Sequence, residues 1–131
     1  MSYWWVGIAG VVGTLLRYCL GLWVQQSVPQ TSFPVGTLMV NLAGCFALGW
    51  FYGWTMSHNR ISPRIRTAVS TGLIGSFTTF STFSVETVQL FRQGLWGIGI
   101  GYAALSLIGG WVLVWWGAAV VRGRKERTQH G

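Results

Sequence analysis

Four long apolar stretches follow one another along the chain, and short polar connections separate them. They run over residues of about 3–24, 34–57, 64–91 and 95–121. Because an α-helix rises about 1.5 Å per residue, roughly 20 apolar residues cross the hydrocarbon core of a bilayer. The pattern therefore predicts an all-α membrane protein, in which residues 1–131 form a single domain of four transmembrane helices.

The connections contain residues that start and stop helices. Pro34 suits the first turn of the second helix, and Ser62 followed by Pro63 is typical of an N-cap and a first helical residue. The run Arg92–Gly94 predicts a tight turn into the fourth helix. Beyond that helix, the tail Arg122–Gly131 is polar and basic, and we expect it to be loose.

The third stretch differs from the others because hydroxyl side chains run through it. Lipid does not solvate these groups, so they must face protein or water. Glycines at 72 and 75 precede crowded β-branched hydroxyl residues, which predicts a break in the helix near residues 75–79, close to the middle of the bilayer. A broken membrane helix leaves backbone carbonyls and amides available to hold ions. The hydroxyl residues are Ser70, Thr71, Ser76, Thr78, Thr79, Ser81, Thr82, Ser84 and Thr87.

The composition excludes a soluble domain of this size. Hydrophobic residues make up 51% of the 131 residues, and charged residues only 8%. The formal net charge is +7, but the basic residues cluster at the ends of the apolar stretches. This clustering is typical of a membrane surface, whereas a nucleic-acid-binding protein distributes its cations over a solvated face. We therefore expect a lipid bilayer as the partner, and no nucleic acid.

The basic residues also predict an orientation. Seven of them lie in the second connection and the tail, against Arg92 alone on the opposite side. The positive-inside rule then places both termini of this multi-pass protein of the cell membrane in the cytoplasm. The ninth cation, Arg17, lies near the end of the first helix. The seven are Arg60, Arg64, Arg66, Arg122, Arg124, Lys125 and Arg127.

The groups that enzymes use are scarce in this chain. Glu86 and Glu126 are the only carboxylates, and the histidines, His58 and His130, lie in a connection and the tail. We therefore predict that the protein is not an enzyme. The alternative is a small multidrug-type proton-coupled exporter, which needs a carboxylate deep in the membrane. Glu86 is the only candidate, and its place toward the Arg92 end favours a solvated or surface role.

Uncharged hydrogen-bond donors recur within the apolar stretches. Thr37 and Asn41 are one turn apart in the second helix, and Tyr102 and Ser106 are one turn apart in the fourth. Donors without carboxylates favour a path for an anion. Taken singly, each residue has a structural alternative: an interhelical packing bond for Asn41, and a bond to a neighbouring backbone for Tyr102 and Ser106.

Two phenylalanines in the third stretch admit two readings. Phe80 and Phe83 are three residues apart, so they share one face of a helix. An aromatic ring has a positive edge, which an anion can approach. Residue type alone favours a packing stripe.

Three sequence runs resemble the Fluc (CrcB) family of fluoride channels. They are Gly10–Tyr18 (GVVGTLLRY), Gly36–Gly44 (GTLMVNLAG) and Gly75–Ser84 (GSFTTFSTFS), and the likeness extends over all four helices. The resemblance implies an antiparallel dimer with two narrow fluoride pores and a structural sodium ion at the dimer centre. By the same likeness, the backbone carbonyls of Gly75 and Thr78 would bind the sodium ion.

The resemblance also implies the residues of the pore. Phe80 and Phe83 would be its aromatic rings, Asn41 its amide donor, and Tyr102 and Ser106 a track of hydroxyls. Ser81 and Thr82 would lie near the path, and Arg17 matches an arginine of the family whose role is open. Fluoride is small and strongly hydrated, so close neutral donors and ring edges must replace its water without trapping it.

The implied function is passive export of cytoplasmic fluoride, which lowers its toxicity. One feature departs from the family pattern: dual-topology homodimers need a weak charge bias, whereas this chain carries seven cations against one. Some relatives are encoded as two paralogues with opposite fixed orientations. The second subunit is therefore either an identical chain or a paralogue.

Overall fold

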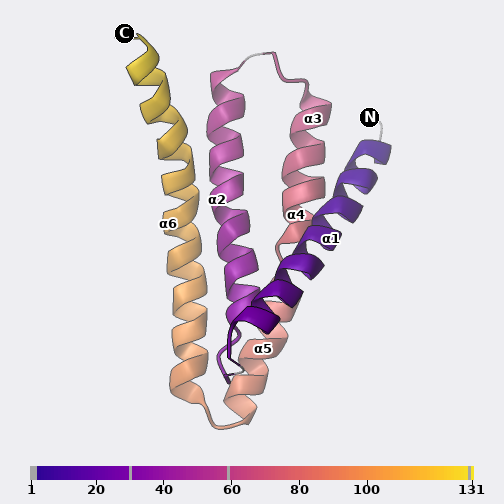
Figure 1. The fold of residues 1–131 in the computed structure, drawn as a ribbon, viewed down its shortest axis with the longest axis vertical. Helices are drawn as coiled ribbons and strands as arrows, with labels where there is room; N and C mark the ends of the chain where they lie inside the picture. Colours follow the sequence, from indigo (N-terminus) through magenta and orange to yellow (C-terminus); the bar gives the residue numbers. More distant parts are fainter. Residues whose placement is uncertain (1–2, 30, 59, 130) are drawn as a thin grey trace.

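The computed structural model describes residues 3–29, 31–58, 60–129 and 131, which form helices and their connections, without a strand. Figure 1 shows three columns, in which α2 and α6 run side by side and α1 crosses the third column obliquely. Both chain ends and the α2–α3 connection lie at one end of the bundle (Figure 1). The elements are α1 (Tyr3–Ser27), α2 (Val35–Ser57), α3 (Pro63–Thr67), the π-helix η1 (Ala68–Ile74), α4 (Gly75–Phe77), α5 (Phe80–Arg92) and α6 (Trp96–Gln129).

Among the described residues, three helices are long and apolar enough to cross a membrane, namely α1, α2 and α6. The fourth crossing is assembled from α3, η1, α4 and α5, which follow one another in the third column (Figure 1). Thr78 and Thr79 have extended backbone conformations between α4 and α5. The predicted all-α architecture with a broken third helix is therefore confirmed, and the break lies inside the interval 75–79.

The helix boundaries follow local chemistry. Ser62 caps α3 by accepting a hydrogen bond from the Ile65 backbone N–H at 3.4 Å, and Pro63 is the first helical residue, as predicted. The connection from α5 to α6 is tight because Gly94 adopts a φ of 76°, which glycine tolerates. Its chain reversal is closed by the Leu95 N–H, which donates to the Leu90 carbonyl at 2.9 Å.

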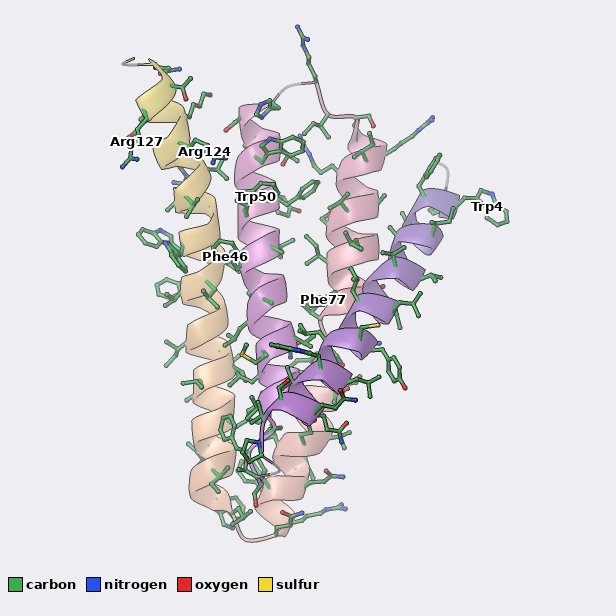
Figure 2. The ribbon with its side chains drawn as sticks, viewed as in Figure 1. Trp4, Phe46, Trp50, Phe77, Arg124 and Arg127 are labelled. Atoms are coloured by element: carbon green, nitrogen blue, oxygen red, sulfur yellow. The ribbon has the colours of Figure 1, made fainter. Side chains whose placement is uncertain are left out.

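Glycines let α2 and α6 approach closely. A Cβ atom at Gly49 of α2 would overlap the Val114 carbonyl of α6. A Cβ atom at Gly117 of α6 would overlap the Phe46 carbonyl and lie 2.8 Å from the Trp50 backbone nitrogen, two residues labelled on α2 in Figure 2. Close packing of this kind favours helix association in lipid, where no hydrophobic effect acts between the helices.

The expectation of a loose tail is wrong. Helix α6 continues through Arg122 and ends only at Gln129. Arginine, lysine, glutamate and glutamine are strong helix formers, and a helix that is already nucleated extends through them at little cost. The Thr128 hydroxyl also donates to the Arg124 carbonyl at 3.0 Å, one turn earlier.

Candidate functional site

The break in the third column is held by one side chain of α2. The Asn41 Oδ1 atom accepts a hydrogen bond from the Thr79 N–H at 2.8 Å, and the Asn41 Nδ2 atom donates to the Thr79 carbonyl at 3.0 Å. Asn41 thus satisfies both backbone groups of Thr79, which is 8% exposed. An extended residue inside a membrane bundle needs such partners, because lipid offers none. Since an amide carries two N–H groups, one donor of Asn41 is left for another acceptor.

Two carbonyls lose their usual helical donors at this break. The Thr79 N–H would close a helical turn onto the Gly75 carbonyl, but it donates to Asn41. The Thr82 N–H would reach the Thr78 carbonyl, but it donates to the Thr79 hydroxyl at 3.2 Å, which caps α5. Gly75 and Thr78 therefore present carbonyl oxygens of the kind that hold alkali cations at unwound membrane helices.

Side-chain metal ligands do not gather anywhere in the described part of the chain. Residues 3–29, 31–58, 60–129 and 131 contain no group of three or more His, Cys, Asp or Glu residues placed to hold a metal ion. The carbonyls of Gly75 and Thr78 at the break are oxygen donors of a kind that would fit a sodium ion.

A carboxylate connects three helices beside the break. The Thr37 hydroxyl of α2 donates to Glu86 Oε1 at 2.8 Å, and the Tyr102 hydroxyl of α6 donates to Glu86 Oε2 at 2.9 Å. Tyr102 is 0% exposed, and Glu86 is half-buried. The expectation for Glu86 was a solvated or surface role; the structure shows it half-buried, lining a cavity, with both of its oxygens accepting hydrogen bonds from side chains of other helices. The residue pattern held one signal, namely that Glu86 shares a helical face with Phe83, three residues before it.

Aromatic rings form a row that leads to this carboxylate. The ring centroids of Phe80 and Phe83 are 5.7 Å apart, and those of Phe83 and Tyr102 are 5.2 Å apart. Phe33 packs edge-on against Tyr102 at 5.7 Å. Phe80 is 77% exposed, so the row runs from the surface of the single chain to its most buried side chain. Consecutive ring contacts thus connect the exposed Phe80 to the hydrogen-bonded hydroxyl of Tyr102.

Two cavities adjoin the break. The first has a volume of about 560 Å³, and the second about 280 Å³. Thr79 lines both, so the braced break separates them. Among the residues of the first are Arg17, Thr37, Thr82 and Glu86. The second is lined by Asn41, Gly75, Thr78, Phe80, Phe83 and Ser106 together with apolar neighbours.

The structure therefore brings most of the sequence-predicted site residues around one break. Ser81 and Tyr102 line neither cavity. The Ser81 hydroxyl lies 3.3 Å from that of Thr79, and Tyr102 bonds to Glu86, which lines the first cavity. The Ser106 hydroxyl is buried and makes no hydrogen bond within the described part of the chain. Tyr102 bonds to a side chain rather than to a neighbouring backbone. A buried hydroxyl on a cavity wall can donate to whatever occupies that cavity.

Comparison with known proteins places this arrangement in a family. The model of the family described as "CrcB-like protein, Camphor Resistance (CrcB)" matches residues 4–118. The chain belongs to the CrcB family. CrcB membership and the apolar helices together make it a multi-pass protein of the cell membrane. The match includes every residue of the site described above and ends within α6, before its basic C-terminal part.

Several CrcB relatives have assigned functions. A protein of Bacillus cereus named "Fluoride-specific ion channel FluC 1" is 48% identical over 113 residues, which cover 86% of this chain and 82% of the relative. "Fluoride-specific ion channel FluC 2" of Geobacillus kaustophilus is 47% identical over 127 residues, or 96% and 98% of the two chains. A FluC 2 protein of Listeria monocytogenes is 38% identical over 130 residues, or 99% and 98%. Each is named as a channel, and none as an enzyme.

Proposed function

We propose that this chain is a fluoride-selective channel, which lowers cytoplasmic fluoride by letting the ion leave passively down its electrochemical gradient. One observation carries the proposal: neutral donors and aromatic rings from α2, α5 and α6 gather around two cavities that share Thr79. The relatives match most of the chain at 38–48% identity, and their names specify fluoride as the ion that they conduct. Fluoride is the substrate, and the lipid bilayer is the medium in which the protein works.

The side chains suit an ion that is small and strongly hydrated. Fluoride in the first cavity would meet the positive charge of Arg17 and the hydroxyl of Thr82. Two hydroxyl donors spread the charge of Glu86, which weakens its repulsion of an anion. Past the break, fluoride would meet the free N–H of Asn41, the hydroxyl of Ser106 and the ring edges of Phe80 and Phe83. Neutral groups replace water there without binding the ion as tightly as a fixed cation would.

The alternative of a proton-coupled exporter is not supported. If the chain were an exporter, we would expect its relatives to be named as exporters. The relatives are instead named as fluoride-specific ion channels. Glu86, the carboxylate that an exporter would use, already accepts hydrogen bonds from Thr37 and Tyr102.

Fluoride efflux from proteoliposomes, read with a fluoride electrode, tests the function. We expect rapid efflux of fluoride and none of chloride from vesicles that contain the folded protein, reconstituted alone or with a paralogue.

Replacing Tyr102 by phenylalanine removes the charge-assisted hydrogen bond to Glu86, and the expected fluoride efflux rate falls about tenfold. Tyr52→Phe is the matched control, because Tyr52 is 44% exposed and is not one of the two hydroxyl donors to Glu86. Folded protein that passes no fluoride in either reconstitution would refute the proposal.

A structural sodium ion at the centre of the dimer belongs to the same proposal. The carbonyls of Gly75 and Thr78 would hold it, since both have lost their usual helical donors. A bound cation would supply positive charge at the break and would fix two subunits relative to each other. Asn41 would contribute indirectly, by keeping Thr79 extended.

The second subunit would pack antiparallel to the first, as an identical chain or as a paralogue. Arg64 and Arg66 lie at the start of the broken crossing and Arg92 at its end, so the cations are segregated to opposite ends of the bundle. The strong bias supports one fixed orientation for this chain and hence a paralogous partner. The names FluC 1 and FluC 2 of the relatives suit organisms that carry more than one such chain.

A C-terminal reporter fusion decides between the two kinds of partner. We expect the C-terminus of this chain to be cytoplasmic in nearly all molecules, since seven cations oppose one. The readout is a pair of fusions, one active only in the cytoplasm and one active only outside it. Comparable activity of the two fusions would contradict the fixed orientation and indicate a dual-topology homodimer.

A further inference from the structure

The C-terminal part of α6 is longer than the membrane requires. Helix α6 has 34 residues, and at 1.5 Å per residue it is about 51 Å long, against about 30 Å for the hydrocarbon core. Its packing partner α2 has 23 residues. Helix α6 extends past α2 at both ends (Figure 1), and the part beyond the C-terminal end of α2 carries the basic residues of the tail.

The packing of α2 against α6 locates the point where the surplus begins. Gly53 of α2 faces Ala118 and Val121 of α6, and α2 ends one turn later at Ser57. Residues after Val121 therefore lie level with the last turn of α2 or beyond it. Trp115 and Trp116, which are 65% and 55% exposed, precede this point by one to two turns. Exposed indoles are typical of the headgroup level, so the residues that follow emerge through the headgroups.

Four cations occupy this emerging part, and we name them the basic collar: Arg122, Arg124, Lys125 and Arg127. All four are exposed, and Arg124 and Arg127 are labelled in Figure 2. At about 100° per residue, Arg124, Lys125 and Arg127 lie roughly 200°, 300° and 140° around the helix from Arg122. The cations thus surround the helix instead of forming one face. Glu126 is the single carboxylate among them.

The encircling arrangement decides which partner fits. A soluble acidic partner docks on one side of a helix and would be matched by cations on one face. Lipid headgroups surround a membrane helix on every side that neighbouring helices leave open. Cations distributed around the helix are therefore complementary to anionic headgroups. We propose that the basic collar binds the headgroups of anionic phospholipids and so anchors the end of α6 in that leaflet. The collar lies beyond residues 4–118, which match the CrcB family model, and the proposal does not depend on fluoride transport.

Lipid retention by the full-length protein tests the proposal. The purified protein is released from mixed micelles of phosphatidylglycerol and phosphatidylcholine, and native mass spectrometry counts the lipids that stay bound. We expect phosphatidylglycerol to be retained over phosphatidylcholine, and replacing all four collar residues by glutamine to lower this preference roughly fivefold or more. Glutamine is a good helix former, so the variant should remain monodisperse and keep its helical circular dichroism.

Single substitutions add a further test, at Arg124 and Glu126, and a matched control, at Arg92. Arg124→Gln should lower the preference for phosphatidylglycerol, whereas Arg92→Gln, which removes an exposed arginine at the opposite end of the bundle, should leave it unchanged. Glu126→Gln should raise the preference, because it removes the only negative charge of the segment. Equal retention by the wild type and the fourfold variant would overturn the proposal. So would inorganic phosphate that displaces the bound lipid at millimolar concentration, since the collar would then be a site for soluble anions.

Discussion

Replacing Asn41 by alanine is expected to lower fluoride efflux about 100-fold, because two hydrogen bonds to Thr79 are lost together. The Thr79 N–H and carbonyl would then lack their side-chain partners, and Thr79 is only 8% exposed. An unsatisfied buried group costs about 1–3 kcal/mol, so the chain should relax by extending α4 or α5 through the break. Relaxation would move the carbonyls of Gly75 and Thr78 away from the second cavity. Efflux from proteoliposomes measures the effect.

Ser57→Ala is the matched control for this substitution. Ser57 also lies on α2 and is half-buried, but its hydroxyl donates to the Gly53 carbonyl of its own helix at 3.0 Å. Fluoride efflux from this variant should equal that of the wild type. If Asn41→Ala protein is folded and conducts at the wild-type rate, the brace is not needed for conduction.

Replacing Gly117 by alanine is expected to destabilise the packing of α2 against α6. The new methyl group would overlap the Phe46 carbonyl and crowd the Trp50 backbone nitrogen, and backbone atoms cannot move aside as a side chain tip can. Overpacking typically costs about 1–3 kcal/mol, and contact with a neighbouring backbone belongs at the upper end of that range. We expect a melting temperature at least about 10 °C lower, or loss of the monodisperse species on size-exclusion chromatography.

Gly123→Ala on the same helix controls for the change of residue type. Nothing lies within 4 Å of a Cβ atom at Gly123, and alanine favours the helix more than glycine does. The melting temperature of this variant should stay the same or rise slightly. Equal melting temperatures for Gly117→Ala and the wild type would mean that α2 and α6 do not pack as closely as described.

These two substitutions address separate layers of the same structure. Gly117 permits α6 to reach α2, and the contact places Tyr102 of α6 beside Thr37 of α2, with Glu86 between them. Asn41 instead holds the extended conformation of Thr79 within the packed bundle. Stability and efflux measured together should therefore separate the two variants: Gly117→Ala lowers the melting temperature, whereas the relaxed Asn41→Ala protein keeps most of the fold and loses conduction.

The sequence by itself determined the helices, the break and the class of protein. Apolar length is a local property, and it predicted crossings that agree with α1, α2 and α6. Ser62 and Pro63 predicted the start of α3, and glycine with the crowded hydroxyl residues predicted a break near residues 75–79, the interval that contains the extended Thr78 and Thr79. Each of these features depends on neighbouring residues along the chain, so no knowledge of tertiary contacts was needed.

Only the tertiary structure decided how the site is connected. Glu86 lies 49 residues from Thr37 and 16 from Tyr102, and no local pattern shows that their hydroxyls converge on its carboxylate. Asn41 likewise finds Thr79 across 38 residues. The cause is physical: periodicity records which face of a helix is apolar, whereas the azimuth and depth at which two helices meet depend on close contacts such as those of Gly49 and Gly117. Those contacts bring a carboxylate, an amide and a break in the backbone together in one site.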